Sequence, residues 1–213
     1  MADRYALVVD STNNNIKEIP AADRLVADNL LLSGTTPTLT IGDAGAEDTK
    51  IVFDGNAQDF YIGLDDSADD LIIGLGSAVG TTPAISIDEN QVAKFEAAIT
   101  EQATDLASGT TVALDVRDGG VFEITLGHDI GTFNWSNHAL SGAVSSFIMK
   151  VVQDGTGSRT IAWPDGTNSV TVRWAGNIAP TLSTGAGDID VFVFFTTDGG
   201  TNYYGFTAGQ DML

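Results

Sequence analysis

The most concentrated chemistry in this sequence lies in the stretch LDDSADDL at 64–71, where carboxylates gather. Carboxylate oxygens are ligands that Ca²⁺ prefers, and the ion takes about six to eight oxygens. The stretch lacks the residue order of an EF-hand loop and the Glu at its last position. A solvated turn whose charges prevent edge-to-edge aggregation is therefore the preferred interpretation, and Ca²⁺ is the one candidate cofactor. The candidate ligands are Asp65, Asp66, Asp69 and Asp70.

No set of residues has the spacing of a familiar catalytic site. His128 and His138 are the histidines of the chain, and no Cys is present to complete a zinc site with them. There is no GxSxG elbow for a nucleophilic serine, and no helical pattern follows the Gly-x-Gly of GLGSAVG at 74–80. The paired carboxylates of a glycosidase would need a cleft, which a sequence does not display. We expect no catalytic residue and no enzyme activity; a glycan depolymerase is the least favoured alternative.

Aromatic side chains near the C-terminus could bind carbohydrate. An exposed ring has an apolar face that suits a sugar ring, and Tyr and Trp add a polar edge. The candidate receptor contacts are Trp135, Tyr203 and Tyr204. The competing interpretation, which we prefer, places these rings in a β-sheet core or between subunits.

The composition describes a folded, strongly acidic protein. Of 213 residues, 43% are apolar and 18% charged, and the formal net charge is -20. Such a surface repels phosphate backbones and anionic lipid, so we expect neither nucleic-acid nor membrane partners. The opening MADRYALVVD has no secretory signal pattern, and no apolar run approaches the ~20 residues of a spanning helix. The sequence therefore predicts a soluble protein made in a cytoplasm.

Residues 1–34 form the first of three expected regions. YALVVD at 5–10 and IKEIP at 16–20 are short strand patterns separated by STNNN, whose residues favour turns. The two strands could form a hairpin. Residues 21–33 fit either a short helix or extended structure, and the run of Leu30, Leu31 and Leu32 favours the extended form.

Residues 35–104 read as short strands separated by turns rich in Asp and Gly. The expected strands are 38–42, 49–55, 60–64, 71–76 and 84–88. Their apolar residues fall on both alternating faces, each stabilising by ~1.5–3 kcal/mol when fully buried, and the segment has little chain with which to cover them. The residues that need a cover are Phe53, Phe60, Ile62, Leu64, Leu71, Ile73 and Leu75. We predict that other copies of the chain cover them in a three-fold β shaft or collar; the alternative is an antiparallel sheet packed on the C-terminal domain.

The segment 88–104 allows two structures. Asp88 and Gln91 resemble a capping box, and Val92, Phe95 and Ile99 fall on one helical stripe. A short helix, acting as a neck in a trimer, is the preferred prediction. The alternative is a turn at ENQ followed by a strand.

Residues 105–213 are expected to form a β-sandwich or jelly-roll-like domain. Runs enriched in β-branched and aromatic residues alternate with turns such as RDGG, DGTGS and TDGG. The expected strands are 110–116, 120–126, 132–136, 146–153, 159–164, 170–174, 190–198 and 202–209.

This last region also carries a series of turn and aromatic motifs. They are Gln-Asp-Gly-x-Gly at 153–157, Arg-Thr-Ile-x-Trp-Pro at 159–164, Trp-Ala-Gly at 174–176, Asp-Ile-Asp-Val-Phe at 188–192, Thr-Asp-Gly-Gly-Thr at 197–201 and Tyr-Tyr-Gly-Phe at 203–206. In this order they resemble a module common in fibre and appendage proteins of tailed bacteriophages. Residues 38–90 resemble a β-rich repeat of marine phage virion proteins, and LVVDSTNNNIKEIPAADRL at 7–25 is similar to N-terminal segments of the same class.

The resemblance implies a homotrimer in the virion, assembled in the host cytoplasm. Its N-terminal segment would dock on capsid or tail and baseplate proteins, and its C-terminal knob would meet a host glycan or another receptor. The chain is short for a long tail fibre, which favours a head fibre, a decoration protein or a small baseplate spike. A short fibre or spike that contacts the host surface is the leading prediction. A head fibre or capsid decoration protein, giving stability or weak adhesion, is the alternative.

Overall fold

The computed structural model describes residues 7–10, 15–18, 28–166 and 169–212. It divides into two compact units, Met1–Ala97 and Ala98–Leu213, so the boundary lies ahead of the one expected after residue 104. The described residues form strands and two short 3-10 turns, Val116–Asp118 and Ala175–Asn177, and contain no α-helix. The all-β fold class predicted from the sequence is confirmed.

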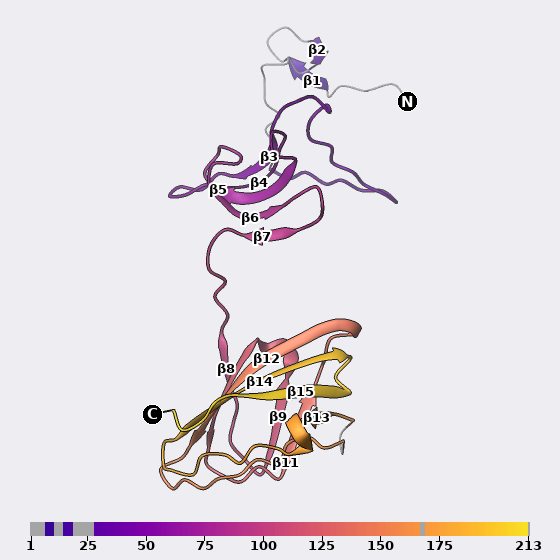
Figure 1. Ribbon diagram of the computed structural model, residues 1–213. Coiled ribbons are helices and arrows are strands. Elements are labelled where there is room, and N and C mark those ends of the chain that lie inside the picture. The colour runs from indigo at the N-terminus through magenta and orange to yellow at the C-terminus, as the bar shows by residue number, and fades with distance from the viewer. Residues whose placement is uncertain (1–6, 11–14, 19–27, 167–168, 213) are drawn as a thin grey trace. The chain divides into compact units, whose positions relative to one another are not determined.

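The N-terminal unit begins with the expected hairpin. Strand β1 (Leu7–Asp10) pairs antiparallel with β2 (Asn15–Glu18). Of the ambiguous segment 21–33, residues 21–27 lie outside the described residues, and 28–33 are neither helix nor strand. The strand expected at 38–42 is absent, and the chain runs without strand pairing from 28 to the start of β3 (Figure 1).

Five strands of the N-terminal unit form an antiparallel meander in chain order (Figure 1). They are β3 (Thr49–Phe53), β4 (Phe60–Asp65), β5 (Asp70–Leu75), β6 (Pro83–Ile87) and β7 (Ala93–Phe95). Asp side chains build the turns: the Asp65 carboxylate accepts hydrogen bonds from the backbone N–H groups of Ser67 and Ala68 between β4 and β5. These are Asx-type turns, in which a side-chain oxygen replaces a backbone acceptor.

The helical neck expected within 88–104 is wrong. Asp88 Oδ1 accepts from the N–H groups of Asn90 and Val92 at 2.9 and 2.8 Å, and Gln91 has a left-handed φ of 66°. The residues that resemble a capping box therefore close the β6–β7 hairpin. The alternative, a turn at ENQ followed by a strand, is confirmed.

The C-terminal unit contains a mixed six-stranded sheet in the order β13-β15-β14-β12-β10-β8 and a two-stranded sheet, β11-β9. The strands are β8 (Ala103–Asp105), β9 (Thr111–Asp115), β10 (Val121–Leu126), β11 (Thr132–Ser136), β12 (Ser141–Gln153), β13 (Thr171–Arg173), β14 (Ile189–Asp198) and β15 (Asn202–Gly209). The pairs β8–β10, β10–β12, β9–β11 and β13–β15 are parallel, whereas β12, β14 and β15 are antiparallel neighbours. The strand expected at 159–164 is reduced to a single bridge between Ile130 and Ile161.

One hydrophobic core joins the two sheets of this unit, and an aromatic cluster occupies its centre. The Trp135 ring lies 5.0–5.1 Å, centroid to centroid, from the rings of Phe147, Phe194 and Tyr203, all in edge-on geometry. Trp135 is 4% exposed and Tyr203 is fully buried. The interpretation of these two residues as surface contacts for a receptor is therefore wrong, because a ring inside the core has no face free for a sugar.

Candidate functional site

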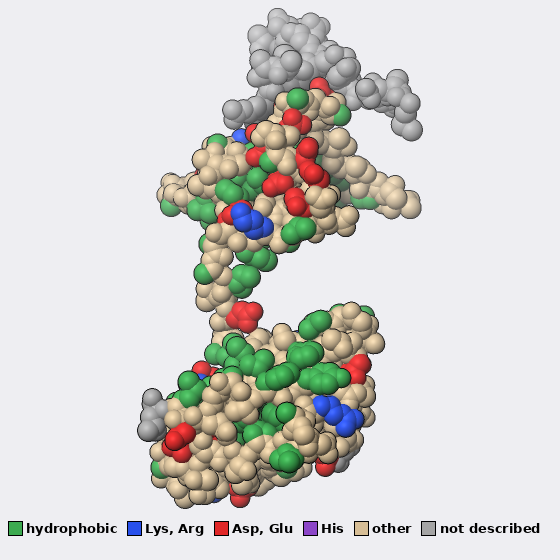
Figure 2. Space-filling model, in the orientation of Figure 1, with side chains coloured by type: hydrophobic (Ala, Val, Ile, Leu, Met, Phe, Trp, Pro, Cys, Tyr) green, Lys and Arg blue, Asp and Glu red, His purple; other side chains and the backbone are tan. Residues whose placement is uncertain are grey.

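The most conspicuous surface of the N-terminal unit is an uncovered apolar face of its five-stranded sheet. Figure 2 shows hydrophobic side chains, in green, gathered on the surface of each unit. All seven residues predicted to need a cover are exposed, from 39% for Ile62 and Leu75 to 55% for Phe53. We call the following set the apolar face: Ile51, Phe53, Phe60, Ile62, Leu64, Leu71, Ile73, Leu75, Ile85, Ile87 and Phe95.

Strand register brings these side chains together. Residues at i and i+2 of a strand share a face, as do directly paired residues on neighbouring strands. Ile62 pairs with Ile51 on one side and Ile73 on the other, and the row continues through Ile85 to Phe95. From the sequence, the apolar residues of this region were expected on both alternating faces of the strands. The residues of the apolar face instead lie on one face of the sheet, and no charged residue is among them.

The middle of the opposite face is covered by the chain itself, whereas Val52 of β3 on that face is 36% exposed. Tyr61 is fully buried and Ile72 is 3% exposed. The loop 76–82 covers them: the Tyr61 hydroxyl accepts a hydrogen bond from Gly80 N–H at 3.1 Å. Glycines lie beside Tyr61 on this face because a Cβ at Gly74 would come within 2.7 Å of the tyrosine ring. The chain therefore covers the middle of one face of this sheet and leaves the apolar face exposed.

Four residues of the apolar face were missing from the set predicted from the sequence. They are Ile51, Ile85, Ile87 and Phe95. Alternation along 49–53 and 83–87 was the available signal for the first three. Phe95 could not be found in this way because its segment was interpreted as a helix.

The C-terminal unit also has an apolar area, on the outer side of its six-stranded sheet. The rings of Phe195 and Phe206 stack at 6.0 Å with an interplanar angle of 9°, and Tyr204 stacks on Phe195 at 5.3 Å. Tyr204 is 46% exposed, so it alone of the three candidate receptor residues lies at the surface. One of its ring faces is already in contact with Phe195, which leaves less of the ring for a sugar.

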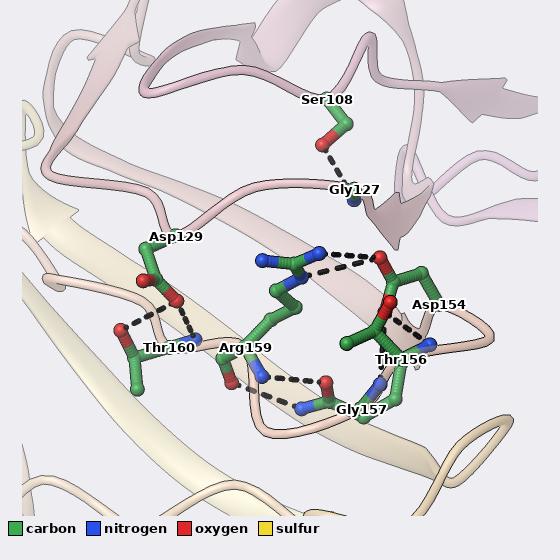
Figure 3. Close-up of polar contacts among 9 residues, drawn as sticks. Ser108, Gly127, Asp129, Asp154, Thr156, Gly157, Arg159 and Thr160 are labelled. Carbon is green, nitrogen blue, oxygen red and sulfur yellow. Dashed lines mark hydrogen bonds and ion pairs between the residues drawn. The ribbon is translucent and has the colours of Figure 1, made fainter.

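The Gln-Asp-Gly-x-Gly motif forms a turn clip (Figure 3). Asp154 forms an ion pair with Arg159 at 2.9 Å, and its other oxygen accepts from the N–H groups of Thr156 and Gly157. The Arg159 guanidinium holds the pKa of Asp154 below its usual range. The Asp129 carboxylate binds the residue that follows Arg159, because it accepts a hydrogen bond from the Thr160 N–H at 2.9 Å. Asp154, Arg159 and Asp129 therefore bind each other or nearby backbone N–H groups, and this bonding gives them a structural role.

The carboxylates proposed for Ca²⁺ lie in the β4–β5 turn. Asp65 Oδ1 accepts from the backbone N–H and the hydroxyl of Ser67, the latter at 2.7 Å. Among the residues that the structure describes, no three His, Asp or Glu side chains gather as metal ligands would. Ca²⁺ binding by Asp65, Asp66, Asp69 and Asp70 stays a prediction.

One of the two histidines, His138, contacts a tyrosine hydroxyl in the C-terminal unit. His138 Nδ1 lies 2.8 Å from the Tyr203 hydroxyl. Burial lowers the pKa of His138 and raises the pKa of Tyr203 to about 12, so a neutral imidazole and a neutral phenol share this bond.

A pocket lined by 131–133 and 162–165 has Asp165 as its only ionisable residue.

Comparison of the chain with protein-family models, with curated proteins and with solved structures finds no match. Among the described residues, no helix has the length and hydrophobicity needed to cross a membrane.

Proposed function

We propose that this protein is a non-enzymatic structural protein that works as a homotrimer, joined through the apolar face of the N-terminal unit. The observation that supports the proposal is the apolar face itself, an uncharged sheet surface on a chain with a net charge of -20. Monomeric soluble proteins rarely expose apolar patches larger than a few hundred Å².

The free energy available from covering this face is substantial. Full burial of a Leu, Ile or Phe side chain stabilises by about 1.5–3 kcal/mol, so covering the exposed four or five tenths gains roughly 0.6–1.5 kcal/mol per residue. Summed over the face, this gain is of the size that stable association needs. A second copy is the partner that suits it best, because an uncharged face lets two strongly acidic chains meet without carboxylates opposing each other at the contact.

The biological setting that we propose is the virion of a tailed phage. It rests on the resemblance of 38–90 and of the C-terminal motifs to virion appendage proteins. In this setting the N-terminal segment attaches to the particle and the C-terminal unit is a knob that meets the host surface. Imaging of particles labelled on this protein tests the setting, and label absent from purified particles would remove it.

The oligomeric state tests the physical part of the proposal. We expect sedimentation equilibrium and native mass spectrometry to show a trimer for the full chain and a monomer for Ile73→Glu. Ile73 lies in the middle of the face and is 42% exposed in the single chain, so the new carboxylate stays solvated and the variant should still fold.

The matched control is Ala78→Glu. Ala78 is exposed in the loop that covers the opposite face, so the same charge is added where no contact is proposed. We expect this variant to remain a trimer. A monomeric parent protein, or equal dissociation of both variants, would contradict the proposed interface.

A further inference from the structure

The segment between the N-terminal hairpin and β3 is a second unpartnered element of the N-terminal unit. We call residues 29–42 the arm. The described part of the chain pairs no strand with it. Its large apolar side chains are all exposed, with Leu31 at 84% and Ile41 at 45%. These side chains are Leu30, Leu31, Leu32, Leu39 and Ile41.

The arm has the sequence of a strand. In TLTIG the residues Leu39 and Ile41 alternate with threonines, which is the period of a half-buried strand. Thr and Ile are residues that favour a pleated, half-covered surface. A strand pattern without a partner indicates that the partner is supplied from outside the single chain.

The arm and the apolar face match in charge. No charged residue occurs from Asn29 to Gly42, in a chain that carries 29 Asp and Glu. Two uncharged apolar surfaces on an acidic protein can meet without burying an unpaired carboxylate, which would cost several kcal/mol.

The connection to β3 allows the arm to reach a neighbouring chain. In its own chain Ile41 lines a groove with Ile51, Ile62 and Leu71, whereas Leu39 and the three leucines are not among its lining residues and are exposed. The link of residues 42–48 contains the left-handed positions Gly42 and Ala44, at φ of 96° and 67°. Seven residues span at most roughly 25 Å when extended, which is enough to cross to an adjacent subunit.

We propose that the arm of one copy lies on the apolar face of a neighbouring copy, with Leu39 and Ile41 as its anchors. This inference rests on the proposed self-association and names the element that covers the face. The exchange is reciprocal around a symmetric ring, so each chain gives one arm and receives one. The trimer is then intertwined rather than assembled from finished monomers.

The absence of Cys permits a direct test by disulfide trapping. Chains with Leu39→Cys and one tag are co-expressed with chains that carry another tag and Ile62→Cys, Ile73→Cys or Ile85→Cys. Because each chain has one thiol, a disulfide between differently tagged chains can form only between copies. We expect such a bond with at least one of the three receiving positions. The matched control replaces Leu39→Cys by Ile178→Cys, an exposed position in the C-terminal unit, and should give none.

A second measurement separates this inference from the proposed function. We expect the double substitution Leu39→Ser and Ile41→Ser to raise the dissociation constant of the trimer at least tenfold, measured by sedimentation equilibrium. If the parent is a trimer, the traps fail and the double variant dissociates like the parent, arm exchange is wrong and self-association stands. If Leu39→Cys and Ile73→Cys placed in one chain close only within that chain, the arm covers its own face and the exchange is again wrong. A monomeric parent overturns both proposals.

Discussion

At the scale of single residues, polar side chains supply hydrogen-bond partners to backbone groups that have none in a strand ladder. Gln153 is 3% exposed, and its Nε2 donates to the carbonyls of Arg159 and Ser183 at 2.9 and 2.8 Å. Its Oε1 accepts from the Arg159 N–H at 2.8 Å. One amide therefore satisfies three backbone groups from two separate segments. The conspicuous motif at 153–157 is explained by this bonding without any ligand.

Gln153→Leu is expected to destabilise the C-terminal unit. Each buried backbone group that loses its partner costs about 1–3 kcal/mol, so we expect the free energy of unfolding to fall by at least about 2 kcal/mol in urea denaturation. Gln210→Leu is the control, because the exposed Gln210 also donates to a carbonyl, that of Thr181, where water can replace it. It should change stability by no more than about 0.5 kcal/mol. Equal effects of the two substitutions would contradict the assigned role of Gln153.

Trp135 shows what residue-scale reasoning from the sequence could and could not establish. The sequence left two positions open for Trp135, a surface contact and a place in a sheet core or between subunits, and favoured the second. Alternation contained the correct signal, since Phe133 and Trp135 share one face of β11 and both are buried. Tyr203 is harder to place from sequence, because its burial depends on the packing of β15 beside β13 and β14.

At the scale of elements, strand positions could be predicted and strand directions could not. Period-two runs located β3 to β6 and most strands of the C-terminal unit to within a few residues, because burial on one face imposes that period. Alternation is the same in parallel and antiparallel pairs, so the four parallel pairings had no signal. The three-residue strands fared differently. Strand β13 lies within the strand predicted at 170–174 and β7 was predicted as the alternative to a helix, whereas β8 lies outside every predicted strand.

The hairpin between β14 and β15 depends on an ionised Asp. The Asp198 carboxylate accepts from the Asn202 N–H at 3.0 Å and from the Asn202 side-chain amide at 2.8 Å. These bonds, the backbone one first, lower the pKa of Asp198 below its usual range. Its contribution to stability is therefore present above the unfolded pKa, near 3.9, and is lost as pH falls through the lower folded pKa.

Asp198→Asn should test this dependence. At pH 6 we expect the variant to have a lower midpoint of urea denaturation than the parent. Below about pH 4 the difference should shrink, since the parent carboxylate becomes protonated and the variant has nothing to titrate at this position. A difference that stays constant from pH 6 to pH 3 would show that Asp198 does not stabilise the hairpin as a charge.

At the scale of the whole molecule, acidity and apolar faces oppose each other. Carboxylates lie in turns and at strand ends, while the apolar face and the arm carry none. In the proposed trimer, copies that meet at these surfaces still bring together chains with a net charge of -20 each. The free energy of assembly is then a hydrophobic gain reduced by long-range repulsion, which salt screens.

Assembly should therefore strengthen with ionic strength. Between 20 mM and 500 mM NaCl the Debye length falls from roughly 20 Å to about 4 Å, so we expect the dissociation constant from sedimentation velocity to fall at the higher salt. A contact held by ion pairs between subunits would show the opposite trend. A constant that rises with salt would thus contradict an uncharged interface.

The meander order of β3 to β7 also bears on when the molecule can assemble. Neighbouring strands joined by short turns can pair as soon as they leave the ribosome, whereas β12 finds its partner β14 only after some forty further residues have been made. The apolar face of the N-terminal unit can thus be exposed while the remainder of the same polypeptide is still being synthesised. In the proposed trimer, nascent chains on one messenger could therefore meet at that stage, before either C-terminal unit has been made.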